Sequence, residues 1–161
     1  MTVMERVVAF ALFAGVLSAQ ELPRTGVKQP AAGEILIATA KSHDPVLARS
    51  VVLLIHCDPD GAMGLIVNRP NGKAYEGGPI ELGVRTLVRS SAKPEGAEHV
   101  AGDIYLLPGI SKSGRVFVGY AGWSAQQLKD EIELGLWKIH PPDSRLVFDP
   151  NPATLWTRLI R

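Results

Sequence analysis

The sequence predicts an α/β domain of the α+β kind, with a mixed, largely antiparallel twisted sheet and few helices. Residues 50–57 form an unbroken β-branched and leucine run, which is typical of a strand covered on both faces. A Pro-Asp-Gly turn at 58–61 then returns the chain into a second apolar run, 63–68. Residues 116–137 pass from a strand through a glycine-rich turn into a capped helix. With 161 residues and 46% hydrophobic content, the chain fits one domain with one core.

The first nineteen residues have the three-part layout of a secretory signal peptide. Arg6 ends a short N-terminal region, and residues 7–17 are apolar throughout. Ser18 and Ala19 are small residues of the kind that precede a signal-peptide cleavage site. This apolar stretch is too short to cross a bilayer core of about 30 Å. The sequence therefore predicts export to the periplasm or the extracellular medium, with no stable membrane span after cleavage.

The leader divides the chain into three parts. Residues 1–19 are the expected signal peptide, residues 20–32 a flexible tether rich in Pro, Gly and Ala, and residues 33–161 the folded domain. Three alternatives stay open: an N-terminal helix packed on the domain, a misassigned start codon, and an uncleaved leader that tethers the domain to a membrane.

Short apolar runs between turn signals predict the strands. Asp44-Pro45 marks the first turn and can begin a short helical turn through Arg49. Residues 70–78 and 90–102 are polar and glycine-containing, so loops are expected there. The expected strands are 34–40, 50–57, 63–68, 84–89, 104–107, 115–120, 137–140 and 145–148.

Two of these assignments concern how strands pair. The run 84–89 alternates apolar and polar residues imperfectly, which is typical of an edge or half-buried strand. Residues 104–107 and 115–120 are separated by a short loop with Gly, Ser and Pro, and we expect them to form a hairpin.

Two helices are expected. Ser124 stands at the N-cap position of the first and Gln127 follows three residues later, which is the spacing of a capping box. Leu128 and Ile132 would face inward, and Gly135 would end the helix as its C-cap. The second helix covers 152–161, with an apolar side made of Leu155, Trp156, Leu159 and Ile160.

The composition excludes several classes of function. The net charge of +1 lacks the basic excess of a nucleic-acid-binding protein. Cys57 is the only cysteine, so no internal disulfide can form, and its place in an apolar run favours burial. The four histidines form no zinc-binding spacing, and no glycine loop for phosphate is present. The sequence therefore predicts no metal, no cofactor and no nucleic-acid partner.

One segment resembles a catalytic motif. Residues 122–126 (Gly-Trp-Ser-Ala-Gln) come close to the nucleophile elbow of hydrolases, but Gln126 replaces its final glycine. Ser124 as a helix cap explains the same residue more simply. The enzyme alternative is a hydrolase that uses Ser124 or Ser50 with a distant histidine, such as His99 or His140.

Four ordered motifs resemble those of the YqgE/AlgH family. The opening 33–38, 44–45 and 49–54 is similar to the start of that family, and 61–70 (GAMGLIVNRP) to its second signature. Gly77-Gly78-Pro79 resembles the third, and 119–132 (GYAGWSAQQLKDEI) the fourth. The resemblance covers residues 33–156.

The resemblance implies a compact α/β fold with a mixed sheet. Family members are often labelled transcriptional regulators, no catalytic residues are established for them, and they are regarded as cytoplasmic, which is the alternative to export here. This chain departs from the family pattern at 71–76 and at 108–114, where members usually carry helices. We therefore expect part of the sheet to be less covered by helices than in other family members.

We expect a non-enzymatic module that binds an unidentified protein or small molecule. The alternatives are the serine hydrolase and a transcriptional regulator, as the family label suggests. The ligand and the oligomeric state stay open. The candidate binding surface consists of Asn68, Arg69, Pro70, Gly77, Gly78, Pro79, Gly122, Trp123, Gln127 and Glu131.

Overall fold

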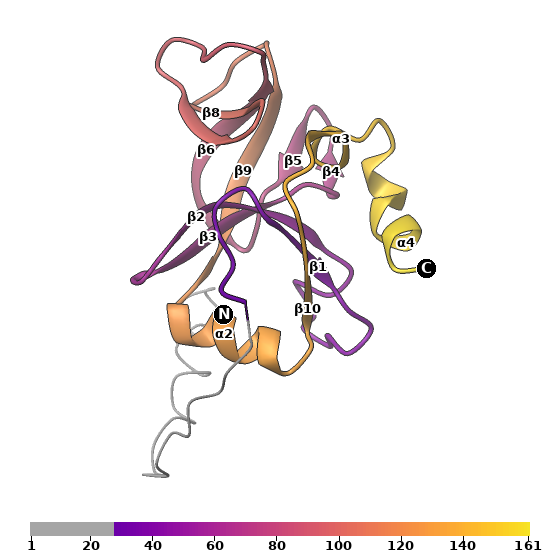
Figure 1. Cartoon of the computed structure of the whole chain (residues 1–161). Coiled ribbons are helices and arrows are strands. Elements are labelled where there is room, and N and C mark those ends of the chain that lie inside the picture. Colours follow the sequence, from indigo (N-terminus) through magenta and orange to yellow (C-terminus); the bar gives the residue numbers. More distant parts are fainter. Residues whose placement is uncertain (1–27) are drawn as a thin grey trace.

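The computed structural model describes residues 28–161. The predicted leader, residues 1–19, lies outside the described residues, as does the larger part of the predicted tether. The described chain forms a curled sheet with a few short helices, which confirms the predicted α+β class (Figure 1).

The sheet is almost entirely antiparallel. Its strands run in the order β10-β1-β2-β3-β9-β6-β8-β7, and β4 and β5 form a small hairpin beside β9. Only the pairing of β5 with β9 is parallel. The strands are β1 (Ile35–Ala38), β2 (Val51–Asp58), β3 (Gly61–Ile66), β4 (Pro70–Asn71), β5 (Ala74–Glu76), β6 (Ile80–Arg89), β7 (Glu98–Ala101), β8 (Ile104–Pro108), β9 (Arg115–Trp123) and β10 (Trp137–His140).

The described helices are short. Helix α2 (Ala125–Glu133) follows β9 directly, and α3 (Ser144–Val147) follows β10. A 3-10 turn, η1 (Pro152–Thr154), leads into α4 (Leu155–Leu159) at the C-terminus, so the predicted terminal helix is confirmed. Helix α2 ends at Glu133 with Leu134 as its C-cap, and Gly135, the predicted cap, lies one position later and adopts a φ of 74° that glycine tolerates.

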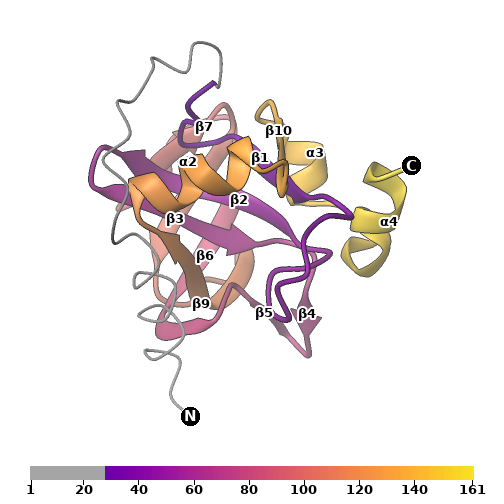
Figure 2. The same ribbon diagram turned by 90° about the horizontal axis from the view of Figure 1, so that it is seen from below.

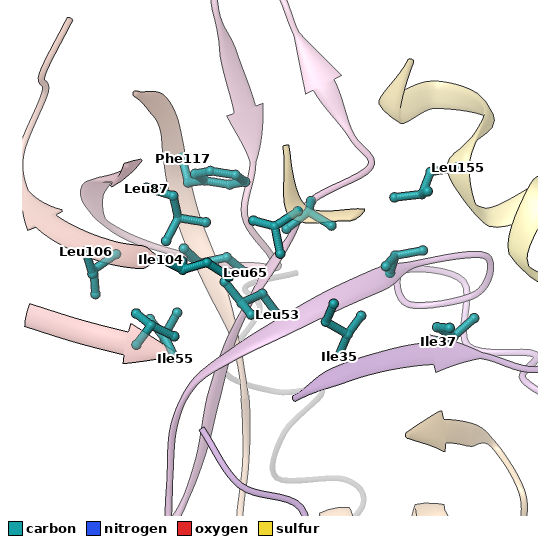
Figure 3. Packing of buried hydrophobic residues seen from close by; sticks show 14 residues of the cluster. Ile35, Ile37, Leu53, Ile55, Leu65, Leu87, Ile104, Leu106, Phe117 and Leu155 are labelled. Atoms are coloured by element: carbon teal, nitrogen blue, oxygen red, sulfur yellow. The ribbon is translucent and has the colours of Figure 1, made fainter. Parts of the chain in front are cut away.

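Strand β2 is apolar on both faces, as its sequence predicted. Val51, Leu53 and Ile55 belong to one buried cluster, whereas Val52 and Leu54 belong to another. The first, which we call the inner cluster, is enclosed by the curled sheet together with α3 and α4 (Figure 3). Its buried members are Ile35, Ile37, Val51, Leu53, Ile55, Leu65, Val67, Leu87, Val100, Ile104, Leu106, Phe117, Val147 and Leu155.

The second cluster, which we call the outer cluster, lies on the opposite face of the sheet under helix α2. In Figure 2, α2 crosses in front of β1, β2 and β3. Leu128 from α2 is 3% exposed and provides the main contact. The buried members of the outer cluster are Leu36, Ala38, Val52, Leu54, Ala62, Ile66, Ala121, Trp123, Leu128 and Trp137.

The predicted hairpin of 104–107 with 115–120 is wrong. Strand β6 lies between the two segments and pairs with both, since Leu87 faces Leu106 on one side and Arg115 on the other. Of the two alternatives for 84–89, the edge strand is wrong for the same reason, whereas the half-buried strand agrees with the structure, in which residues 86–88 are buried and Arg89 is exposed. The longer strand β6 extends over ten residues and offers both neighbours a full hydrogen-bonding edge.

The predicted strand at 145–148 is also wrong, because these residues form helix α3. Asp143 caps this helix by accepting a hydrogen bond from the Arg145 backbone N–H at 2.9 Å. The guanidinium of Arg115 donates to the carbonyl oxygens of Val147, Phe148 and Asp149 at the other end. The expected loops at 70–78 and 90–102 contain β4, β5 and β7, which are too short for their patterns to stand out.

A pair of glycines crosses strand β9 at van der Waals distance. The Gly77 backbone N–H donates to the Val118 carbonyl oxygen at 2.8 Å. A Cβ atom on Gly78 would collide with the backbone of Tyr120 and Ala121, which cannot move aside. These glycines are therefore required for close packing of two backbone segments.

We predict that Gly78→Ala lowers the free energy of unfolding by about 3 kcal/mol, because the added methyl group meets main-chain atoms. Gly122→Ala is the matched control. Its nearest neighbour would be the flexible end of the Ile80 side chain at 3.1 Å, so we expect a loss below about 1 kcal/mol. Urea denaturation of both variants tests this, and equal losses would contradict it.

Candidate functional site

The glycine-rich corner between β9 and α2 is held by a helix cap. The Ser124 side-chain oxygen accepts a hydrogen bond from the Gln127 backbone N–H at 3.1 Å, as the sequence predicted. Trp123, just before the cap, is 5% exposed and packs edge to face against Trp137, with ring centroids 5.9 Å apart. Trp123 is therefore a core residue at this corner, with little surface available to a ligand.

The geometry around the serines gives no support to the hydrolase alternative. His99 Nε2 lies 2.8 Å from the Gly102 carbonyl oxygen, and His140 Nδ1 lies 2.7 Å from that of Pro141. Ser50 is buried and donates its hydroxyl to the Leu47 carbonyl oxygen at 2.6 Å. Within residues 28–161, none of the hydrogen bonds joins a serine hydroxyl to a histidine ring.

Asn68 holds the start of strand β2 in place. Its Oδ1 accepts a hydrogen bond from the Val51 backbone N–H at 2.9 Å, and its Nδ2 donates to the Arg49 carbonyl oxygen at 2.9 Å. Arg49 is the one described non-glycine residue with a positive φ, 60°. Asn68 is 9% exposed and satisfies backbone groups on both sides of this unusual residue.

The neighbouring Arg69 is half-buried and lies near two acidic side chains. Its Nη2 donates to the Ala48 carbonyl oxygen at 3.2 Å. Burial lowers the pKa of the guanidinium, while the charges of Glu76 and Asp44 act in the opposite direction. Asp44 was read from the sequence only as a turn residue, and it does accept hydrogen bonds from the Val46 and Leu47 backbone N–H groups.

Glu131 is the most perturbed acid of the described chain. Burial is the main cause that raises its pKa, to about 7, and the charges of Asp44 and Asp130 add to the rise. The indole N–H groups of Trp137 and Trp123 face the carboxyl and act in the opposite direction. Asp44 thus lies near enough to influence both Arg69 and Glu131, a grouping that the sequence did not reveal because Asp44 and Glu131 are far apart in the chain.

Some of the remaining residues of the predicted surface are packed against other segments, and others are exposed to solvent. Gly77 and Gly78 pack on β9, whereas Pro70 is exposed and Pro79, Gly122 and Gln127 are half-buried. The structure therefore brings Trp123, Gln127 and Glu131 together at α2 and places Asn68, Arg69 and Pro70 at the end of β3. That these residues form one binding surface stays a prediction.

An apolar patch lies on the outer face of β6 and β9, beyond the reach of α2. Val84 and Val118 are directly paired across these strands, on the face opposite to the buried Phe117. The Gly109 backbone N–H donates to the Val84 carbonyl oxygen at 2.9 Å, which sets Ile110 beside them. We call Val84, Ile110, Val116 and Val118 the outer patch.

The loop that carries Ile110 covers a small part of this face. The Thr86 hydroxyl donates to the Gly109 carbonyl oxygen at 2.8 Å and accepts from the Ser111 backbone N–H at 3.0 Å, and Thr86 is fully buried. Val118 is nevertheless 47% exposed and Ile110 78% exposed. None of the described helices lies over this part of β6 and β9 (Figure 1).

Of two cavities in the described chain, one is small and the other is largely polar. One of about 20 Å³, enough for a single water molecule, lies beside Cys57 and Leu128. Burial raises the pKa of the Cys57 thiol, which donates to the Pro30 carbonyl oxygen at 3.2 Å. A cleft of about 250 Å³ separates the β7–β8 turn from α3 and is lined by Asp103, Asp143 and Arg145.

Residues 28–161 lack two further kinds of site. No three His, Cys, Asp or Glu side chains in this range gather closely enough to hold a metal ion. None of the helices described in it has the length and apolar character needed to cross a bilayer.

We predict that Asn68→Ala lowers the free energy of unfolding by about 2–3 kcal/mol, because it leaves the Val51 N–H and the Arg49 carbonyl without partners. Asn71→Ala, at an exposed position of β4, is the control and should change stability by less than about 0.5 kcal/mol. Denaturant unfolding gives both values. A near-neutral Asn68→Ala would contradict the structural role.

Comparison with known proteins gives relatives that match most of their own length and most of this chain. A UPF0301 protein of Streptomyces avermitilis is 31% identical over 163 aligned positions, which take in 80% of this chain and 84% of the relative. The UPF0301 protein of Thermobifida fusca is 33% identical over 168 positions, with 80% and 85% covered. Both alignments are longer than the whole 161-residue chain, so the relatives contain internal residues that this chain lacks.

Two solved structures share the fold. The crystal structure of protein DIP2367 from Corynebacterium diphtheriae matches with a TM-score of 0.72 and 21% identity, over 91% of this chain and 94% of that one. The solution structure of the AlgH protein from Pseudomonas aeruginosa matches with a TM-score of 0.65 and 24% identity, over 83% and 90%. The AlgH-like family matches residues 35–161. With the four sequence motifs and these relatives in agreement, the chain belongs to the AlgH-like family.

Proposed function

We propose that this protein is a non-enzymatic binding module that recognises a protein partner through the outer patch. The observation that supports the proposal is the exposure of Val118 and Ile110, 47% and 78%, on a sheet face that none of the helices within residues 28–161 covers. Apolar side chains gathered on one surface favour contact with another apolar surface, since contact removes both from water. The outer patch contains no charged side chain, so the facing side chains of the partner should be apolar as well.

A protein partner fits this surface better than a small molecule does. Sites for small molecules are usually enclosed clefts of about 300–1,000 Å³ with apolar walls. The cavity beside Cys57 holds about 20 Å³, and the cleft at α3 is lined largely by polar and charged residues. The outer patch, by contrast, is an open surface on two paired strands.

The outer patch adjoins the surface predicted from the sequence. The Gly77 N–H that bonds the Val118 carbonyl places the Gly77–Pro79 segment against the same stretch of β9. The loop at 109–113 stands where the family resemblance leads us to expect a helix. A partner could therefore occupy a sheet face that longer relatives have additional residues to cover.

We predict that replacing both Val118 and Ile110 by Asp weakens partner binding at least roughly tenfold without unfolding the protein, because both side chains are exposed. The matched control is Leu134→Asp, at an equally exposed apolar residue, 67%, at the end of α2. Immobilised wild-type protein would select partners from envelope and cytosolic fractions. The purified partner would then be titrated against all three proteins.

Two outcomes would contradict the proposal. The first is a partner that binds the double variant as tightly as the wild type. The second is a partner whose binding is lost in Leu134→Asp but kept in the double variant. Circular dichroism and the unfolding midpoint of each variant show that the fold is intact.

We further propose that the protein is exported, because residues 1–19 have the layout of a signal peptide. When the full chain is expressed in bacteria, we expect a mature N-terminus at Gln20 in the periplasmic or secreted fraction. Ala19→Arg removes the small residue before the cleavage point and should leave the precursor intact. N-terminal sequencing tests this, and an uncleaved wild-type chain in the cytosol would contradict it.

A further inference from the structure

The carboxyl group of Glu131 lies between helix α2 and two tryptophans of the outer cluster. Leu128 precedes Glu131 by three positions and is buried against the sheet, so both side chains share one side of the helix. Trp123 ends the strand before α2, and Trp137 begins the strand after it. The carboxyl is thus enclosed by the helix and by the elements that flank it in the chain.

Two polar atoms of this arrangement are left without a standard hydrogen bond among the described residues. They are Oε2 of Glu131 and Nε1 of Trp137, an acceptor and a donor, and both are buried. Neither of the two cavities described above is lined by these residues. A ligand that satisfied them would have to displace α2, whereas a proton needs no cavity.

The charges that face Glu131 are negative. Asp44 contributes from the 39–50 loop and Asp130 from α2 itself. The positions of β3 and β9 that face α2 carry no titratable side chain, and Lys138 of β10 points to the other face of its strand from Trp137. The side chain of Lys41 lies against Gly135, just beyond the end of α2.

We propose that Glu131 is a proton-operated switch for helix α2: the protonated carboxyl lets the helix pack fully on Trp123 and Trp137, and loss of the proton loosens that packing. An ionised carboxylate in this position has two indole N–H groups to approach, but it is partly withdrawn from water and lies near the negative charges of Asp44 and Asp130. It therefore favours conformations in which the end of α2 moves toward water.

The surroundings of Glu131 place the pH at which this switch operates in the physiological range. Burial and the two aspartates raise the pKa of Glu131 from 4.5 to about 7. A folded-state pKa above the unfolded one means that the folded state binds the proton more tightly. The stabilisation is complete below about pH 4.5 and is lost as the pH rises through about 7.

The test follows carboxyl and indole resonances by NMR, together with hydrogen-exchange protection of the α2 amides, between about pH 5.5 and pH 8. We expect the Glu131 carboxyl and the Trp137 indole N–H to titrate together near pH 7. Protection of α2 should fall at least roughly tenfold over this range, because opening the helix returns Glu131 to its ordinary pKa. In Glu131→Gln, protection should no longer change with pH.

Two further variants separate this switch from a structural effect. Asp44→Asn keeps an oxygen to accept from the Val46 and Leu47 N–H groups but removes the charge, so the midpoint should move to lower pH. Glu81→Gln, at an exposed position of β6, should change nothing. Wild type and Asp44→Asn decide the matter even if Glu131→Gln fails to fold.

Three results would overturn the proposal. One is a Glu131 carboxyl that titrates near 4.5 in the folded protein. Another is an Asp44→Asn variant whose midpoint does not move. The third is a folded Glu131→Gln variant whose α2 protection keeps the wild-type pH dependence, which would assign that dependence to another group.

Discussion

The sheet of this protein is apolar on both faces, and each face must be kept from water. The inner face is enclosed because the sheet curls on itself and α3 and α4 close the remaining side. Within residues 28–161, the outer face is covered by helix α2, nine residues long, and by the loop over Thr86. This unequal cover leaves Val118 and Ile110 in contact with water, and their exposure is the basis of the binding proposal.

The position of α2 depends on backbone packing rather than on a long apolar helix face. Gly78 lets the chain cross β9 where any side chain would collide, and Ser124 then begins the helix at a fixed point after Trp123. Only Leu128 of the helix is deeply buried. A helix with so few apolar contacts depends on polar groups at its edge, which gives the protonation of Glu131 its influence on packing.

The residues of the four family motifs have different physical roles in this structure. Asn68 is a buried hydrogen-bonding residue that satisfies the backbone beside the strained Arg49. Trp123 and Gly78 are packing residues, and Glu131 is a buried acid among groups that disfavour its charge. The binding proposal therefore relies on the outer patch, whose four residues all lie outside the four motifs. The family resemblance explains the framework that presents this patch.

Features that arise between close neighbours in the chain were determined by the sequence alone. The Ser124 cap, the end of α2 beside Gly135 and the β2–β3 hairpin were all predicted, because each depends on residues within a few positions. The place of β6 between β8 and β9, the helix at 144–147 and the burial of Glu131 were decided by the tertiary structure. Each depends on contacts between distant segments, such as Arg115 with the end of α3 or Asp44 near Glu131. Local patterns carry no record of such contacts, because their free energy arises only when the segments meet.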